Sequence, residues 1–150
     1  MVTTALTRMV ARLLLAPVLI VAAAILVKGY VDVGDGFAAA VIAALGVLTQ
    51  YVAFGRHEAE RSLALRRASR LAVGGLLLAL VVAFAPYLMG DALLEHAPRP
   101  GAGAVTVGTL ELITAVVFDV GIFLLVLGVA LSIIHFIADA ASAASDGEHA

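Results

Sequence analysis

LITAVVFDVGIFLLVLGVALSIIHFIA, residues 112–138, is the stretch that decides what kind of protein this is. Its only ionisable side chains are those of Asp119 and His135. A helix needs about 20 apolar residues to cross the roughly 30 Å hydrocarbon layer of a bilayer. This stretch exceeds that length, so it predicts a membrane-spanning helix with room to tilt.

Three further blocks without charged residues cover residues 13–27, 36–55 and 71–90. The first is short, but Arg12 and Lys28 flank it, and such long side chains can extend towards the membrane surface. Of all 150 residues, 63% are hydrophobic and 13% are charged, whereas soluble domains are roughly 45–50% apolar. The sequence therefore predicts an all-α, polytopic membrane protein with about four transmembrane helices.

The basic residues indicate how such helices are oriented, because lysine and arginine gather on the cytoplasmic side of membrane proteins. In a four-span layout, one side of the membrane holds only Lys28 and Arg99. The other side holds the remaining basic residues, which are Arg8, Arg12, Arg56, Arg61, Arg66, Arg67 and Arg70. This bias predicts that both termini are cytoplasmic.

The segments between the blocks differ in character. Residues 56–70 are charged and lack glycine and proline, which predicts a short amphipathic helical turn at the cytoplasmic surface. Residues 91–109 are rich in proline and glycine, which predicts an irregular outer loop. We expect one membrane domain over residues 1–140 and a flexible polar tail over residues 141–150.

Most catalytic and binding signatures are absent from the chain. It has no cysteine, which excludes thiol chemistry. The run GDGFAA at residues 34–39 matches a loose dinucleotide fingerprint, but that fingerprint requires a soluble βαβ unit. No basic stripe with interleaved aromatic residues indicates a nucleic-acid partner. We therefore expect no enzymatic activity, no cofactor and no tightly bound metal.

Asp119 is the main candidate for a functional residue, because ionisable groups at membrane depth are costly and often functional. Two interpretations stay open: a member of a cation or proton path, and a structural carboxylate. The predicted spans contain no basic residue, so we expect its partner outside this chain's own helices. At about 100° per residue, the opposite face carries Gly121, Gly128 and Ser132, which are small enough for close helix packing.

Four other residues are candidates for the ion path. Thr114 and His135 share the fourth block with Asp119, and histidine can relay protons near neutral pH. Asp32 and Asp35 lie in the first outer connection, where they could attract cations. For Asp35 the alternative is a helix N-cap, since aspartate is favoured there.

Three stretches carry a resemblance to a known family. They are TRMVARLLLAP (7–17), GYVDVGDGF (29–37) with the later YVAFG (51–55), and TAVVFDVGIFLLVLG (114–128). In these the chain resembles the MnhB/MrpB subunit of Mrp-type cation/proton antiporters, from about Thr7 to Ala138.

The likeness of the first outer connection is partial. The family stretch usually has the form Gly-His-x-x-Pro-Gly-Gly-Gly-Phe, and here Tyr30, Val33 and Asp35 replace its histidine, its proline and its middle glycine. These departures put the shape of the loop in doubt. The positions that match the family, and that we expect to shape the loop, are Gly29, Gly34, Gly36 and Phe37.

The resemblance implies the B-type component of a multi-subunit sodium/proton antiporter in the bacterial cell membrane. Its implied partners are the other subunits, the lipid bilayer and the transported Na⁺ and H⁺. In such complexes small subunits contribute to the sodium path or to the scaffold around it, so the chain should not be active alone. The alternatives are a structural membrane subunit of a related hydrogenase or complex-I-like assembly, and a self-assembling channel with Asp119 lining its pore.

Overall fold

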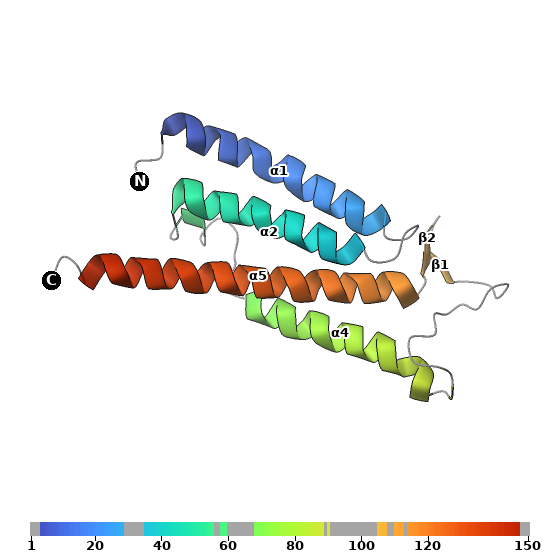
Figure 1. Cartoon of the computed structure of the whole chain (residues 1–150). Coiled ribbons are helices and arrows are strands. Elements are labelled where there is room, and N and C mark those ends of the chain that lie inside the picture. The colour runs from blue at the N-terminus through green and yellow to red at the C-terminus, as the bar shows by residue number, and fades with distance from the viewer. Residues whose placement is uncertain are drawn as a thin grey trace.

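A computed structural model describes residues 4–28, 35–55, 58–59, 68–88, 90, 105–107, 110–112 and 114–147 of the chain. Its long helices are α1 (Ala5–Lys28), α2 (Asp35–Phe54), α4 (Ala68–Leu88) and α5 (Thr114–Gly147), as Figure 1 shows. All four are long and apolar enough to cross a membrane. The prediction of an all-α membrane protein with four spans is confirmed.

Local chemistry fixes several helix ends. The hydroxyl of Thr4 accepts a hydrogen bond from the backbone N–H of Thr7 at 3.3 Å, which caps the start of α1. Gly55, with a φ of 80°, follows the last residue of α2 and donates its N–H to the carbonyl of Tyr51 at 2.9 Å. Glycine favours such helix ends because it adopts positive φ without steric cost.

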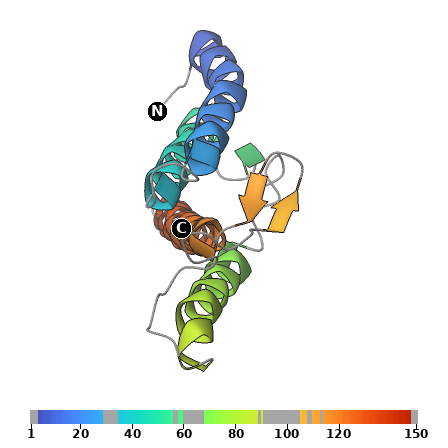
Figure 2. The ribbon, with the colours of Figure 1, turned by 90° about the vertical axis from the view of Figure 1, so that its right-hand side faces the viewer.

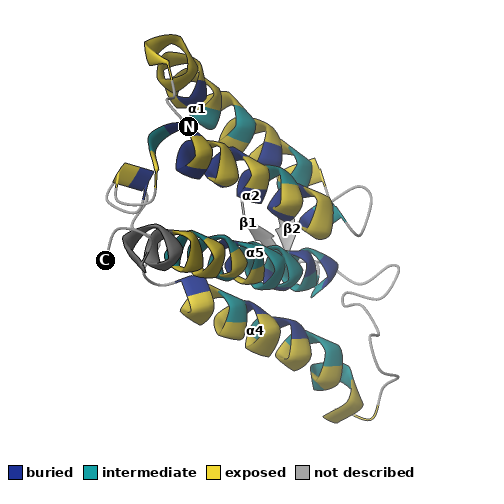
Figure 3. Ribbon diagram, turned by 60° about the vertical axis from the view of Figure 1, so that its left-hand side comes forward, coloured by how far each residue is buried: buried dark blue, intermediate teal, exposed yellow. Residues whose placement is uncertain are grey.

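The four helices form a single row instead of a closed bundle. α1 packs on α2, α2 packs on α5, and α5 packs on α4, and Figure 2 shows this order nearly end-on. The last helix in the sequence therefore lies between the second and the third. Half of the α2 span is buried, against 11% of α1 and of α4, and Figure 3 shows the broad exposed faces of these two outer helices.

The helices of the row run roughly along one direction, and both ends of the described chain lie at the same end of that direction (Figure 1). The start of α1, with Arg8 and Arg12, lies at this end, and so does the start of α4, with Arg70. Lys28 lies at the opposite end, as the last residue of α1. Whether the arginine-rich end faces the cytoplasm stays a prediction from the charge bias.

The connection before α5 contains a short β-ribbon. Strand β1 (Val105–Val107) pairs antiparallel with β2 (Leu110–Leu112), with Thr106 opposite Glu111. The expectation of a wholly irregular loop was wrong here, because all three residues of β1 are β-branched and such residues favour strands. Leu112 consequently belongs to β2, and the fourth span begins at Thr114.

α5 also continues further than expected. It runs to Gly147, so residues 141–147 of the expected flexible tail are helical. The physical reason is the run of alanines in this stretch, since alanine has the highest intrinsic helix propensity. Of the expected amphipathic turn over residues 56–70, Glu58 and Ala59 are helical and 68–70 begin α4. Its other residues lie outside the described parts of the chain.

A buried amide joins α1 to α2. The Gln50 side chain is 4% exposed and donates through Nε2 to the backbone carbonyl of Ala11 at 2.7 Å. Ala11 itself is 3% exposed, so this hydrogen bond is shielded from lipid and water. Hydrogen bonds between membrane helices contribute about 0.6 kcal/mol on average and up to about 2 kcal/mol.

We expect Gln50→Leu to lower the stability of the α1–α2 pair by about 1 kcal/mol, because leucine removes the donor without changing the volume greatly. Thr49→Val is the matched control. The Thr49 hydroxyl donates to the Leu45 carbonyl of its own helix at 2.8 Å and crosses no interface. Thermal unfolding in detergent checks the difference, and equal losses in both variants would contradict the role of Gln50.

Candidate functional site

Asp119 lies near the start of α5 and is almost fully buried. It is five residues beyond Thr114, which corresponds to a depth of about 7.5 Å along the helix. Only 2% of its surface is exposed. Residues of this chain therefore cover Asp119. The expectation that its partner lies outside this chain's own helices stays a prediction.

The start of α2 lies against the backbone of Asp119. Gly36 lies in the first turn of α2, directly against the backbone of Asp119. A Cβ atom at Gly36 would overlap the carbonyl oxygen of Asp119 and would lie 3.2 Å from its Cα. Only glycine allows this approach of the two backbones. Gly36 therefore holds two helices close together and is not a loop residue.

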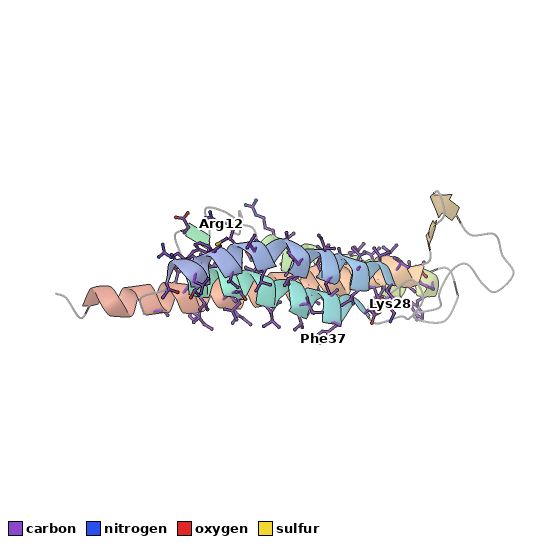
Figure 4. All side chains as sticks on the ribbon, turned by 90° about the horizontal axis from the view of Figure 1, so that it is seen from above. Arg12, Lys28 and Phe37 are labelled. Atoms are coloured by element: carbon purple, nitrogen blue, oxygen red, sulfur yellow. The ribbon has the colours of Figure 1, made fainter. Side chains whose placement is uncertain are left out.

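Phe37 is the second residue that was expected to shape a loop and instead belongs to α2. The helix begins two residues earlier, at Asp35, because an acidic first turn complements the positive end of the helix dipole. Phe37 is 58% exposed. Figure 4 shows it on the outside of α2, pointing away from the other helices. It contributes to the exposed apolar surface of α2.

Asp35, the first residue of α2, is a second carboxylate near the contact between α2 and α5. Its Oδ2 atom lies 3.6 Å from Nζ of Lys28, the last residue of α1. The Lys28 side chain is 62% exposed and that of Asp35 is 27% exposed, but the Oδ2 atom of Asp35 is itself buried. Because Asp35 is the neighbour of Gly36, it lies next to the α2–α5 contact that covers Asp119. The structure thus places two of the candidate acids at one junction.

The opposite side of α5 packs against α4 through small residues. A Cβ atom at Gly121 would lie 2.9 Å from the backbone nitrogen of Ala79, and one at Gly128 would lie 2.8 Å from Cα of Ala72. A Cβ atom at Gly75 would lie 2.6 Å from the Gly121 carbonyl oxygen. We call this contact the glycine seam. It places Gly121 and Gly128 in a close helix pair, with α4 as the neighbour.

The remaining candidates do not gather around Asp119. The Ser132 hydroxyl donates to the Gly128 carbonyl of its own helix at 2.7 Å. His135 lies 3.5 Å from the carboxylate of Asp139, and both side chains are about two-fifths exposed, at 40% and 43%. His135 is sixteen residues from Asp119, or about 24 Å along the helix. No direct proton transfer connects them.

Thr114 is the first residue of α5 and is half-buried near the ribbon end. Asp32, Gly29 and Gly34 lie outside the described residues. Within the described residues, no group of three or more acidic or histidine side chains could hold a metal ion. The candidate site that the structure supports is therefore the α2–α5 junction formed by Asp119, Gly36 and Asp35.

Two elements of this arrangement escaped the sequence analysis. Gln50 is an amide residue inside an uncharged and largely apolar block, and that contrast was a usable signal for a helix–helix hydrogen bond. The partners of the glycine seam on α4 are Ala72, Gly75 and Ala79, which recur at helical spacing. Small residues at such intervals favour close packing in membranes.

Comparison with known proteins agrees with this architecture. A family model described as a domain related to the MnhB subunit of the Na⁺/H⁺ antiporter matches residues 6–132. The chain belongs to the MnhB family. The match covers α1, α2, α4 and most of the spanning part of α5.

A relative of this MnhB-family chain is the B-type component of the Na⁺/H⁺ antiporter of Alkalihalophilus pseudofirmus. The two sequences are 33% identical over 115 residues, which is 74% of this chain and 76% of the relative. The expected family and the expected function, a subunit of a multi-subunit Na⁺/H⁺ antiporter, are confirmed. With its four apolar helices, the chain is a multi-pass protein of the bacterial plasma membrane and has other antiporter subunits as partners.

Proposed function

We propose that this MnhB-family subunit has no complete ion path of its own and acts in sodium/proton exchange by positioning α2 against α5 at Asp119. The observation that carries the proposal is the 2% exposure of Asp119 together with the backbone contact of Gly36. A carboxylate in an apolar environment is costly unless protein groups stabilise it. Its burial at a helix contact supports a role in fixing that contact.

The row arrangement supports the dependence on partners. A transporter surrounds its ion site with helices, several of them broken near the middle of the membrane. Here the outer helices α1 and α4 each contact mainly one neighbour. Their outward faces carry exposed large hydrophobic residues, including Ile20 at 68% and Val81 at 64%. Lipid and neighbouring subunits are the surfaces that cover these faces.

A second candidate function for the junction is direct binding of the transported Na⁺ or H⁺. It is favoured by the nearness of Asp35, because two carboxylates at one end of a helix contact attract cations. In this case Asp119 would exchange its ion through a path that the neighbouring subunits complete. The two candidates differ in whether the carboxylate is needed for its charge or for its shape.

The dependence on partners is tested by reconstitution. We expect vesicles containing the complete antiporter to exchange Na⁺ for H⁺, and vesicles containing this chain alone to show no exchange. A tag on this chain should co-purify the other antiporter subunits in mild detergent, as mass spectrometry would show. A stable homo-oligomer that moves ions without partners would contradict the proposal.

A further inference from the structure

The arginine-rich end of the α1–α2 pair contains a cleft to which the proposed function assigns no role. It has a volume of about 480 Å³ and opens where α1 begins and α2 ends. Its lining includes Arg8, Arg12 and Leu13 from α1, and Phe54 and Glu58 from the end of α2 and the turn after it. Both signs of charge and apolar side chains therefore meet in one hollow.

The two arginines form one wall of this cleft. They are four residues apart on α1, so they lie one helical turn apart on the same face. The guanidinium carbon of Arg12 lies 5.2 Å from the centre of the Phe54 ring. This cation–π contact holds the guanidinium on α2. The guanidinium fork matches the geometry of a phosphate group.

The position of the cleft relative to the membrane identifies the source of such a phosphate. Arg12 immediately precedes the uncharged block of residues 13–27, so the arginines lie at the level of the lipid headgroups. Met9 and Leu13 line the cleft and are 62% and 63% exposed. They offer an apolar surface to whatever extends from the phosphate into the hydrocarbon layer. A phospholipid has both a phosphate group and apolar chains.

Glu58 restricts the type of headgroup. It places a carboxylate in the cleft with the two guanidinium groups, which disfavours a second negative charge on the ligand. A ligand with an ammonium group beside its phosphate can pair with the carboxylate and with the guanidinium groups. We propose that the cleft binds phosphatidylethanolamine, with its phosphate on Arg8 and Arg12 and its ammonium group on Glu58.

The test uses the purified antiporter complex containing this chain and photoactivatable lipids with a diazirine near the headgroup. We expect capture of phosphatidylethanolamine on this chain, with cross-links at Met9 or Leu13. The double variant Arg8→Gln with Arg12→Gln should reduce capture about tenfold, because both phosphate contacts are lost. Arg70→Gln is the matched control, since Arg70 is an exposed arginine at the same membrane end but outside the cleft.

Glu58→Gln and lipid competition test the choice of headgroup. With the wild-type chain, phosphatidylglycerol should be captured several-fold less than phosphatidylethanolamine, and Glu58→Gln should remove this preference. Equal capture of the two lipids by the wild-type chain, or an unchanged preference in Glu58→Gln, would overturn the assignment of the ammonium group. Unchanged capture in the double arginine variant, or complete displacement of the lipid by excess inorganic phosphate, would overturn the lipid site itself.

Discussion

Gly75→Val is expected to separate α4 from α5, whereas the same substitution at the adjacent Gly74 leaves the pair intact. A Cβ atom at Gly75 would overlap the backbone nitrogen of Leu125 and would lie 2.6 Å from the carbonyl oxygen of Gly121. Backbone atoms cannot move aside as a flexible side chain can. At Gly74 a Cβ atom meets nothing within 4 Å. The two variants share helix, depth and added volume, and differ only in the contact with α5.

We expect Gly75→Val to cost about 3 kcal/mol, at the upper end of the range for overpacking a well-packed contact. Gly74→Val should cost less than about 0.5 kcal/mol, as is typical of substitutions away from packed features. The measurements are thermal unfolding of the purified protein in detergent and recovery of the assembled antiporter. Equal behaviour of the two variants would show that α4 does not approach α5 through the glycine seam.

Asp119→Ala is expected to reduce both assembly of the antiporter and Na⁺/H⁺ exchange in vesicles, the latter by about tenfold or more. Alanine removes the carboxylate that is buried where Gly36 meets α5 and leaves a void, and voids of this kind cost on the order of 1 kcal/mol or more. Asp119→Asn retains the shape and one oxygen acceptor. If the carboxylate acts by positioning α2, we expect the asparagine variant to assemble and to retain exchange.

The asparagine variant separates the two candidate functions. An assembled Asp119→Asn complex without exchange would mean that the charge is required and would place Asp119 in the ion path. Ser132→Ala is the control, because its hydroxyl donates to the Gly128 carbonyl in the preceding turn of α5. Normal assembly and normal exchange in Asp119→Ala would remove Asp119 from the site.

The number of spans was predictable from the sequence, because uncharged apolar blocks of about 20 residues are typical of helices that cross a bilayer. The two-sided character of α5 was also predictable, since helical periodicity places Asp119 and Gly121 on different faces. Periodicity does not show which helix packs against each face. The contact of α2 with the backbone of Asp119 depends on Gly36 lying inside a helix. The glycine-rich sequence around Gly36 equally favours a loop. The position of a helix start within such a stretch is decided by tertiary contacts.

The β-ribbon and the helical extension to Gly147 illustrate a second limit. In both places the secondary-structure propensity of a few residues differs from what the composition of the whole segment favours. Val105 and Thr106 favour a strand within a segment rich in turn residues. The alanines after Ala140 favour a helix although the segment is polar. Composition alone favoured irregular structure in both places. Summed local propensity over a few residues gives the better prediction there.

The position of α5 between α2 and α4 constrains how the ribosome and the insertion machinery build this protein. α1 and α2 can associate as soon as both have left the translocon, but α4 enters the lipid before its main neighbour has been synthesised. The small-residue face of α4 stays uncovered until α5 has been inserted. A truncated chain that ends before α5 would therefore leave the small-residue face of α4 without its main neighbour.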